Sequence, residues 1–311
     1  MNDLTLMEAL VGAHERTLPE EAPVVLLRQL PLDELQSRAR RFISMLQKQD
    51  VCAHDNGNWQ QRDDQTVVHL PGGARTVAYH ASGALEYVSG LAPATVPFKR
   101  CHEKEELVRQ VNASAEQLGL ANWAPPGSEL AFERLFQSKA RGADRKGKLA
   151  DTALFRAIGA YRQLIGGLPV LGAASAALKL AGDGQVDTLS VAMRPSTGEV
   201  LERAKIIEPE VASRQIVLQL SSLLGTSAIG RDKVESAVMW LGYLDLGKRK
   251  PQRVLAPMYV AQVVLRHTHV RQAYVLAVRA TEKTWLEAPL LGTEALPTVS
   301  RNHACTHDRA G

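Results

Sequence analysis

The chain has 311 residues, of which 45% are hydrophobic and 5% aromatic, and it carries a formal net charge of +4. This length allows two domains or one large domain, with cores built mostly from Leu, Val and Ala. The weak positive charge is too dispersed to indicate nucleic-acid binding, and no apolar run reaches the ~18 residues that span a membrane.

The three cysteines, Cys52, Cys101 and Cys305, are too few and too far apart to build a disulfide framework. They fit a reducing compartment. The N-terminal residues show no basic start followed by an apolar core, which a secretory signal would need. We therefore expect a soluble, cytoplasmic protein that does not contact a membrane.

The hydrophobic pattern predicts helices that alternate with groups of short strands. Near the N-terminus, Leu4, Met7, Leu10 and Val11 share one helical face, so residues 1–22 form either a short docking helix or a partly ordered leader. In chain order, the pattern then predicts a strand at 24–30, a helix at 32–49, a polar turn region at 54–64, strands at 66–70, 74–80 and 84–89, a helix at 101–118, extended runs at 130–137 and 154–164, a helix at 208–224, an apolar run at 234–244, strands at 254–265 and 273–279, and a disordered tail at 289–311.

The clearest pattern lies in residues 161–209, which are predicted to form an antiparallel meander. A Gly-Gly pair at 166–167 separates one extended run from the next, and an Asp-Gly pair at 183–184 lies between two apolar runs, as in a β-hairpin. Residues 186–193 alternate like a strand with one buried face, and residues 199–207 continue as a further strand.

Two short motifs in this meander, and one later strand, share the pattern of a known family. The motifs are Tyr-Arg-Gln at 161–163 with Gly-Gly-Leu-Pro-Val-Leu-Gly at 166–172, and the hairpin Gly-Asp-Gly-Gln-Val at 182–186. With the strand at 256–265, they resemble the propeptide modules of secreted metalloproteases and the related PepSY modules, over about residues 100–280.

The resemblance implies a cystatin-like α+β fold and a role in binding or restraining a protease, not catalysis. The chain departs from the family pattern in two ways. It shows no signal peptide, and it contains no His-Glu-x-x-His motif, so we do not expect it to be the precursor of a metalloprotease.

These patterns predict an α+β fold in which curved antiparallel sheets pack on helices, as repeated cystatin-like modules. The repeated feature is a helix followed by antiparallel strands, with a small-residue turn at 80–83 and again at 181–184. We expect an N-terminal leader (1–22), a first module (23–100), a larger second unit (101–288) and a disordered tail (289–311).

Residues 138–150 are predicted to form a flexible basic loop. A contact with phosphate or nucleic acid is one use of such a run, but a solvated loop is favoured, and no aromatic residue is interleaved for base stacking. Nucleic acid is therefore not an expected partner. The basic residues are Lys139, Arg141, Arg145, Lys146 and Lys148.

The histidines do not form a specific metal motif. His267 and His269 would share one face of a strand, but no third ligand lies near them in the sequence, so two surface histidines are favoured. His303, Cys305 and His307 alternate in the predicted tail, where rigid supporting residues are missing. We predict neither a metal nor a cofactor.

Two cysteine–histidine pairs could be nucleophile–base pairs: Cys52 with His54, and Cys101 with His102. Nothing supplies an orienting carboxylate at a known spacing, so nucleophilic catalysis is not expected. The sequence motifs of nucleotide binding, dinucleotide binding and the hydrolase nucleophile are also absent.

A curved sheet over a helix often encloses an apolar pocket, in which a few polar groups can perform acid–base chemistry. The large or polar residues near the predicted sheet are candidates for lining such a pocket, although each is more often a core or sheet-surface residue. These candidates are Tyr161, Arg194, Glu199, Trp240, Tyr243 and Tyr259.

We predict a non-catalytic, inhibitor-like binding protein that holds a protein partner or a small apolar ligand on a concave antiparallel sheet. The alternative is a biosynthetic enzyme of the isomerase or cyclase type, which works in an apolar pocket without a recognisable motif. The sequence leaves open which of the two is correct.

Overall fold

The computed structural model describes residues 3–12, 18–52, 57–92, 96–98, 103–143, 145–225, 234–267, 270–287 and 293–296. Several of the histidines and cysteines considered above lie outside the described residues, and so does the side chain of His267. These are His54, Cys101, His102, His269, His303, Cys305 and His307.

The chain divides into two compact units, which are described separately. The large unit comprises residues 20–205 and 242–257, and the small unit comprises residues 1–19, 206–241 and 258–311. Both units combine segments that are far apart in the sequence. The predicted boundary at residue 100 therefore falls inside the large unit.

The main sheet of the large unit is built from antiparallel strands. These are β2 (Asn58–Gln61), β3 (Gln65–His69), β4 (Arg75–Tyr79), β5 (Leu85–Val88), β6 (Ser128–Ala140), β7 (Ala153–Ile165), β8 (Leu168–Leu171), β9 (Ala176–Leu180) and β10 (Val186–Val191). Their order in the sheet is β8-β7-β9-β10-β5-β4-β3-β2, and β6 pairs with β7. Because β5 pairs with β10, residues on both sides of position 100 share one sheet.

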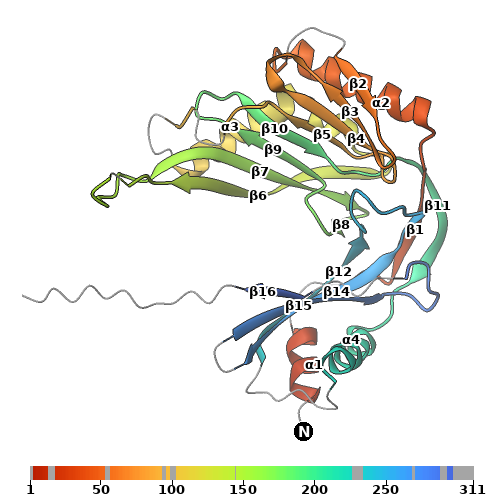
Figure 1. Cartoon of the computed structure of the whole chain (residues 1–311). Coiled ribbons are helices and arrows are strands. Elements are labelled where there is room, and N and C mark those ends of the chain that lie inside the picture. The colour runs from red at the N-terminus through yellow and green to blue at the C-terminus, as the bar shows by residue number, and fades with distance from the viewer. Residues whose placement is uncertain are drawn as a thin grey trace, which may run out of the picture. The chain divides into compact units, whose positions relative to one another are not determined.

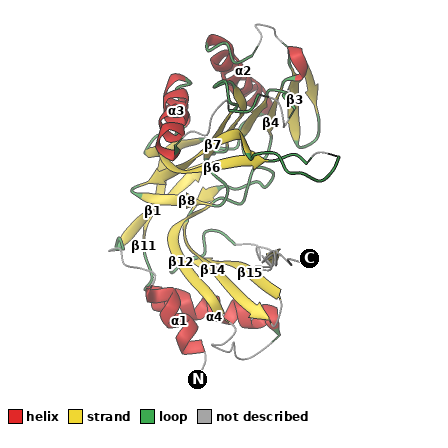
Figure 2. Cartoon of the chain, turned by 90° about the vertical axis from the view of Figure 1, so that its left-hand side faces the viewer, coloured by secondary structure: helices red, strands yellow, loops and turns green. Residues whose placement is uncertain are grey.

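Two helices of the large unit, α2 (Leu32–Lys48) and α3 (Lys104–Gln117), lie on the same side of this sheet (Figures 1 and 2). Apolar side chains recur at helical spacing in both helices, so each buries one stripe, with Phe42 in α2 and Val111 in α3. The approach of α3 to β7 is close enough to require glycine at position 159, where a Cβ would lie 2.2 Å from Val111 Cγ1.

A second, three-stranded sheet of the large unit has the order β11-β1-β13. Its strands are β1 (Glu21–Leu27), β11 (Ser196–Lys205) and β13 (Val254–Leu255). The pairing of β1 with β11 is antiparallel and places Val25 opposite Val200. Short 3-10 turns occur at Pro71–Gly73 and Leu120–Trp123.

The small unit contains the helices α1 (Asp3–Gly12) and α4 (Pro209–Leu224) and the strands β14 (Pro257–His267), β15 (Val270–Arg279) and β16 (Thr293–Leu296). Most of β12 (Val234–Leu244) belongs to it as well. In Figure 2, α1 and α4 lie together along one side of β12, β14 and β15. Pro209 begins α4 and the left-handed Gly225 ends it, as the sequence predicted.

The last residues of β12, which belong to the large unit, pair with β8 in parallel. The sheets are therefore not purely antiparallel. Three further expectations also differ from the structure. The strand β2 lies inside the predicted turn region 54–64, β6 extends to Ala140 in the predicted basic loop, and β16 lies inside the predicted disordered tail.

The central hairpin was predicted correctly. β9 and β10 pair across a turn in which Ala181 N–H donates to the carbonyl of Gln185, and the left-handed Gly184 lies at the end of the turn. The mixture of helices with large antiparallel sheets confirms an α+β fold. Among the described helices, none has the length and apolar character needed to cross a membrane.

Candidate functional site

The face of the main sheet opposite α2 and α3 carries two aligned rows of side chains. Residues that pair across antiparallel strands point to the same face, so the strand register defines these rows. One row is Arg134, Ala160, Ala177, Ser190, Glu86 and Val77, and the other is Phe136, Ile158, Lys179, Thr188, Val88 and Arg75. We call these two rows the open face.

The open face differs from the helix-covered face in the size and polarity of its side chains. The helix-covered face supplies the main core, which includes Leu178 and Leu189. On the open face, Ala177 and Ser190 are half-buried and small, and Phe136 is 49% exposed. The central strands therefore present a surface that another chain can approach closely.

Lys179 is the charged residue at the centre of the open face. It is half-buried and lies beside Ile158 on β7 and Thr188 on β10. Within the described part of the chain, no hydrogen bond or ion pair involves its ammonium group. A partly buried charge is costly unless it is paired, so this ammonium group is a candidate contact for an acidic ligand.

The β4–β5 end of the open face is covered by residues 245–250. Lys248 Nζ lies 2.6 Å from Glu86 Oε2 and 4.5 Å from the centre of the Tyr79 ring. Burial alone would raise the pKa of Glu86, but the hydrogen bond and charge of Lys248 bring it below the ordinary value. Burial likewise opposes the charge of Lys248, and Glu86 raises its pKa above the ordinary value.

Arg194 holds this covering segment in place. Its guanidinium group, which is 3% exposed, donates to Asp245 Oδ1 at 2.9 and 3.0 Å. It also donates to the carbonyl oxygens of Ala81, Gly247 and Lys250. All three guanidinium nitrogens are therefore engaged, and Arg194 acts as a structural clamp and is not a free ligand-binding cation.

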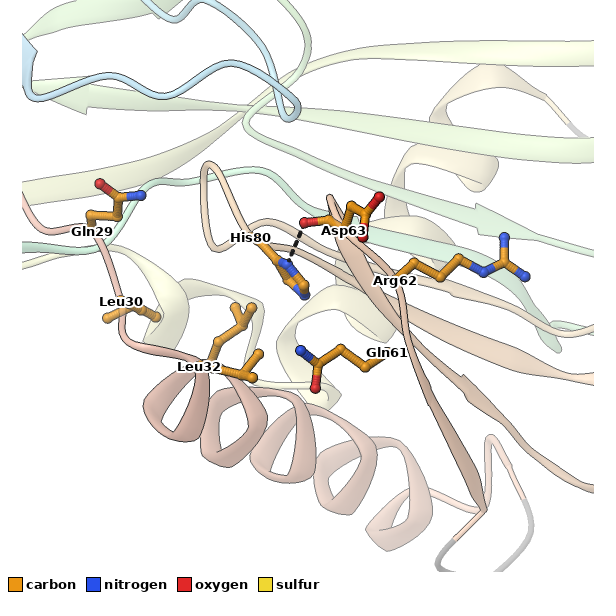
Figure 3. Close-up of a pocket in the computed structure, with 8 residues that line it drawn as sticks. Gln29, Leu30, Leu32, Gln61, Arg62, Asp63 and His80 are labelled. Atoms are coloured by element: carbon orange, nitrogen blue, oxygen red, sulfur yellow. Dashed lines mark hydrogen bonds between the residues drawn. The ribbon is translucent and has the colours of Figure 1, made fainter.

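A cavity of about 400 Å³ lies beside the start of α2 and is shown in Figure 3. It is lined by the segment before α2, with Leu32, and by two hairpin turns that contribute Asp63 and His80. The His80 ring is fixed at both nitrogens. Nδ1 donates to the carbonyl of Asp63 at 3.1 Å, so Nε2 accepts from the Thr66 hydroxyl at 2.9 Å. Neither nitrogen is free to transfer a proton to a ligand.

A second cavity, of about 250 Å³, lies between β1, β11 and the residues just before β6. Val25, Ile165 and Leu255 supply part of its apolar wall, while Arg194 and Arg203 are its cationic residues. We call it the β1–β11 cavity. In this cavity, apolar side chains and positive charge lie together.

Among the described residues, Cys52 is poorly suited to nucleophilic catalysis. Burial raises the pKa of the Cys52 thiol to about 11, so the thiol stays protonated near neutral pH and is a weak nucleophile. In the described ranges, no three side chains of His, Cys, Asp or Glu come together as a potential metal site.

The six predicted pocket residues do not form one cluster in either unit. Arg194 lines the β1–β11 cavity, and Tyr243 packs in the core cluster that contains the cavity residues Val25 and Leu255. Tyr161 is instead buried against α3, where its hydroxyl donates to Asn112 Oδ1. Burial raises the pKa of Tyr161 to about 12, so this phenol is a poor acid.

The other three candidates lie elsewhere. Glu199 is exposed on β11. Trp240 and Tyr259 belong to the small unit, where Trp240 is 41% exposed and the buried Tyr259 hydroxyl donates to the carbonyl of Ile207 at 2.9 Å. The sequence interpretation also overlooked Lys179 and Arg203. A lysine between two buried leucines of β9 was the available signal for the first, whereas the exposed Arg203 gave none.

No protein-family model matches the chain, and no curated protein matches it. Among solved structures, an uncharacterized protein from Eubacterium rectale is similar to this chain with a TM-score of 0.51 and 12% identity, over 87% of this chain and 86% of its own. It therefore shares the fold. The Bacillus megaterium YpeB C-terminal domain aligns over 87% of this chain and 99% of its own, at 11% identity, with a TM-score of 0.30, which is too low to establish a shared fold.

Proposed function

We propose that this chain is a non-catalytic binding protein that holds a protein partner on the open face. The observation that carries this proposal is the half-buried Lys179, whose ammonium group has no partner among the described residues. A carboxylate from a bound chain would supply the missing pair. The small side chains of Ala177 and Ser190 beside it would let a partner backbone approach.

The charges of the open face indicate the chemistry of the partner. Arg134, Lys179 and Arg75 contribute positive charge. Glu86 is the acidic residue of the two rows, and Lys248 neutralises it. Complementary potentials steer association and select partners, so the proposed partner presents an acidic segment with apolar side chains that pack on Phe136.

We also propose that the chain is related to the PepSY modules. The motif residues at 166–172 supply β8, and those at 182–186 supply the β9–β10 turn, so both motifs lie at strand and turn positions. This placement supports a PepSY-like, cystatin-like module, and the repetition of such modules along the chain is part of the same proposal. A binding or inhibitor-like role is what that resemblance implies.

A biosynthetic enzyme of the isomerase or cyclase type is the second candidate, and the apolar β1–β11 cavity favours it. The residues available for acid–base work count against it. Arg194 is engaged at all its nitrogens, and both nitrogens of His80 are bonded elsewhere. Conversion of any small molecule by the purified chain would favour the enzyme.

Photo-crosslinking tests the proposed function directly. A photoreactive amino acid replaces Thr188, on the open face, or Ser37, which is exposed on α2, and each full-length variant is irradiated in extract from the source cells. We expect a single crosslinked protein at position 188 and none at position 37. No crosslink at 188, or the same crosslink at both positions, would contradict the proposal.

A further inference from the structure

We propose that the β1–β11 cavity binds a small apolar monocarboxylate, with the carboxylate at Arg203 and the apolar chain against Val25, Leu27, Ile165 and Leu255. This site is distinct from the open face, and the inference does not depend on the proposed function. The cavity lies wholly within the large unit, at the meeting of the three-stranded sheet with the end of β7.

The cation of this site is Arg203. The other arginine at the cavity, Arg194, already donates to Asp245 and to backbone carbonyls. Arg203 is exposed on β11, and its guanidinium group makes no ion pair or hydrogen bond with the described residues. It can therefore form a two-pronged contact with a carboxylate without breaking an existing bond.

The apolar residues that line the cavity also pack against a buried tyrosine. Tyr243 is fully buried, and it packs with Val25, Leu27 and Leu255, all of which line the cavity. Its hydroxyl has no hydrogen-bond partner among the described residues. Buried hydroxyls are usually paired, but Tyr243 does not line the cavity, so this hydroxyl is assigned no contact with the ligand.

The charge of Arg203 also affects the buried phenol of Tyr243. Burial raises the pKa of Tyr243, and the positive charge of Arg203 works in the opposite direction. The carboxylate itself would pair with Arg203 through both oxygens, because the Tyr243 hydroxyl is fully buried and does not line the cavity.

The size and lining of the cavity restrict the ligand further. Its volume of about 250 Å³ is below the roughly 300–1,000 Å³ that is usual for drug-sized ligands. The wall residues Val25, Leu27, Ile165 and Leu255 offer apolar contact and no acidic group that would attract a cation. The site therefore fits a medium-chain acid, for which octanoate is a suitable probe.

Titration calorimetry with the full-length chain tests this site. We expect saturable one-to-one binding of octanoate, and binding of octanol and octylammonium that is at least about tenfold weaker. Arg203→Gln should weaken octanoate binding by at least about tenfold. Lys205→Gln, which removes an exposed cation on the same strand that does not line the cavity, should leave binding unchanged. Tyr243→Phe, which changes a buried hydroxyl that does not line the cavity, should leave octanoate binding unchanged within about twofold.

Thermal unfolding of each variant establishes that it is folded. Several results would overturn the inference: no saturable octanoate binding at millimolar concentration, equal binding of octylammonium, or equal octanoate affinity in Arg203→Gln and the unchanged chain. None of these results would affect the open face, which is tested by crosslinking at a different surface.

Discussion

Adjacent residues of β9 show how differently the two faces of the main sheet are built. Leu178 is fully buried in the core beneath the helices, whereas Lys179, the next residue, is half-buried on the open face. Strand geometry alone turns them to opposite sides. The covered face gains stability from close packing. The open face keeps a charge without a partner among the described residues, and that charge does not help the chain to fold.

We expect the largest change in stability at Arg194, because it holds the segment that covers one end of the open face. Arg194→Met should lower the free energy of unfolding by about 3–5 kcal/mol, since it leaves Asp245 without its buried partner. Chemical denaturation measures the change. Arg253→Met, at an exposed position nearby, is the control and should change stability by less than about 0.5 kcal/mol. Equal effects of the two substitutions would show that the clamp is unimportant.

The covered face should be almost as sensitive. Leu178→Ala removes a fully buried side chain from the core between the sheet and the helices. We expect a loss of about 2–5 kcal/mol in the free energy of unfolding, because the cavity left behind is only partly filled. A loss below about 1 kcal/mol would mean that this face is loosely packed.

The ion pair of Lys248 and Glu86 predicts a small dependence on pH. The pKa of Glu86 lies below its ordinary value of 4.5, so its stabilisation is present above pH 4.5 and is lost as the pH falls through the lowered pKa. Lys248 has a pKa above its ordinary value of 10.5, so its contribution is complete below pH 10.5 and is lost as the pH rises through the raised pKa.

Glu86→Gln should therefore cost no more than about 1 kcal/mol at neutral pH, and this cost should disappear in acid. Denaturation midpoints measured from neutral to acidic pH check the prediction. Glu129→Gln, at an exposed position on β6, serves as the control. If both substitutions show the same pH dependence, the pair with Lys248 makes no specific contribution.

The smallest expected effect on stability is at Lys179. Lys179→Ala removes a charge that has no partner among the described residues, so the free energy of unfolding should change by less than about 0.5 kcal/mol. The same substitution should weaken partner binding. A loss of stability above about 2 kcal/mol would show instead that the ammonium group supports the fold.

Local rules in the sequence predicted much of the fold. The stripe of α2, the hairpin of β9 and β10, and the Pro and Gly at the ends of α4 were all recognisable, because neighbouring residues determine such features. The pairing of β5 with β10, and the division into two units, were not recognisable. They depend on contacts between residues far apart in the chain, which neither periodicity nor turn chemistry encodes.

The candidate sites were harder to predict for a similar reason. Arg194 was selected as a pocket residue because it is a large cation near a strand, but its bonds to the 245–250 segment make it a clamp. Arg203 lies nine residues later on the same segment of chain and was overlooked. Whether an arginine is engaged or free depends on the segment folded against it, and the local sequence does not specify that segment.

The most direct test of the open face is the affinity of the crosslinked partner for charge variants of the chain. Lys179→Glu should raise the dissociation constant by at least about tenfold, since it places a carboxylate against the acidic segment of the partner. Lys48→Glu, on the exposed last turn of α2, should leave it within about twofold. Equal dissociation constants for the two variants would contradict the claim that the partner binds the open face.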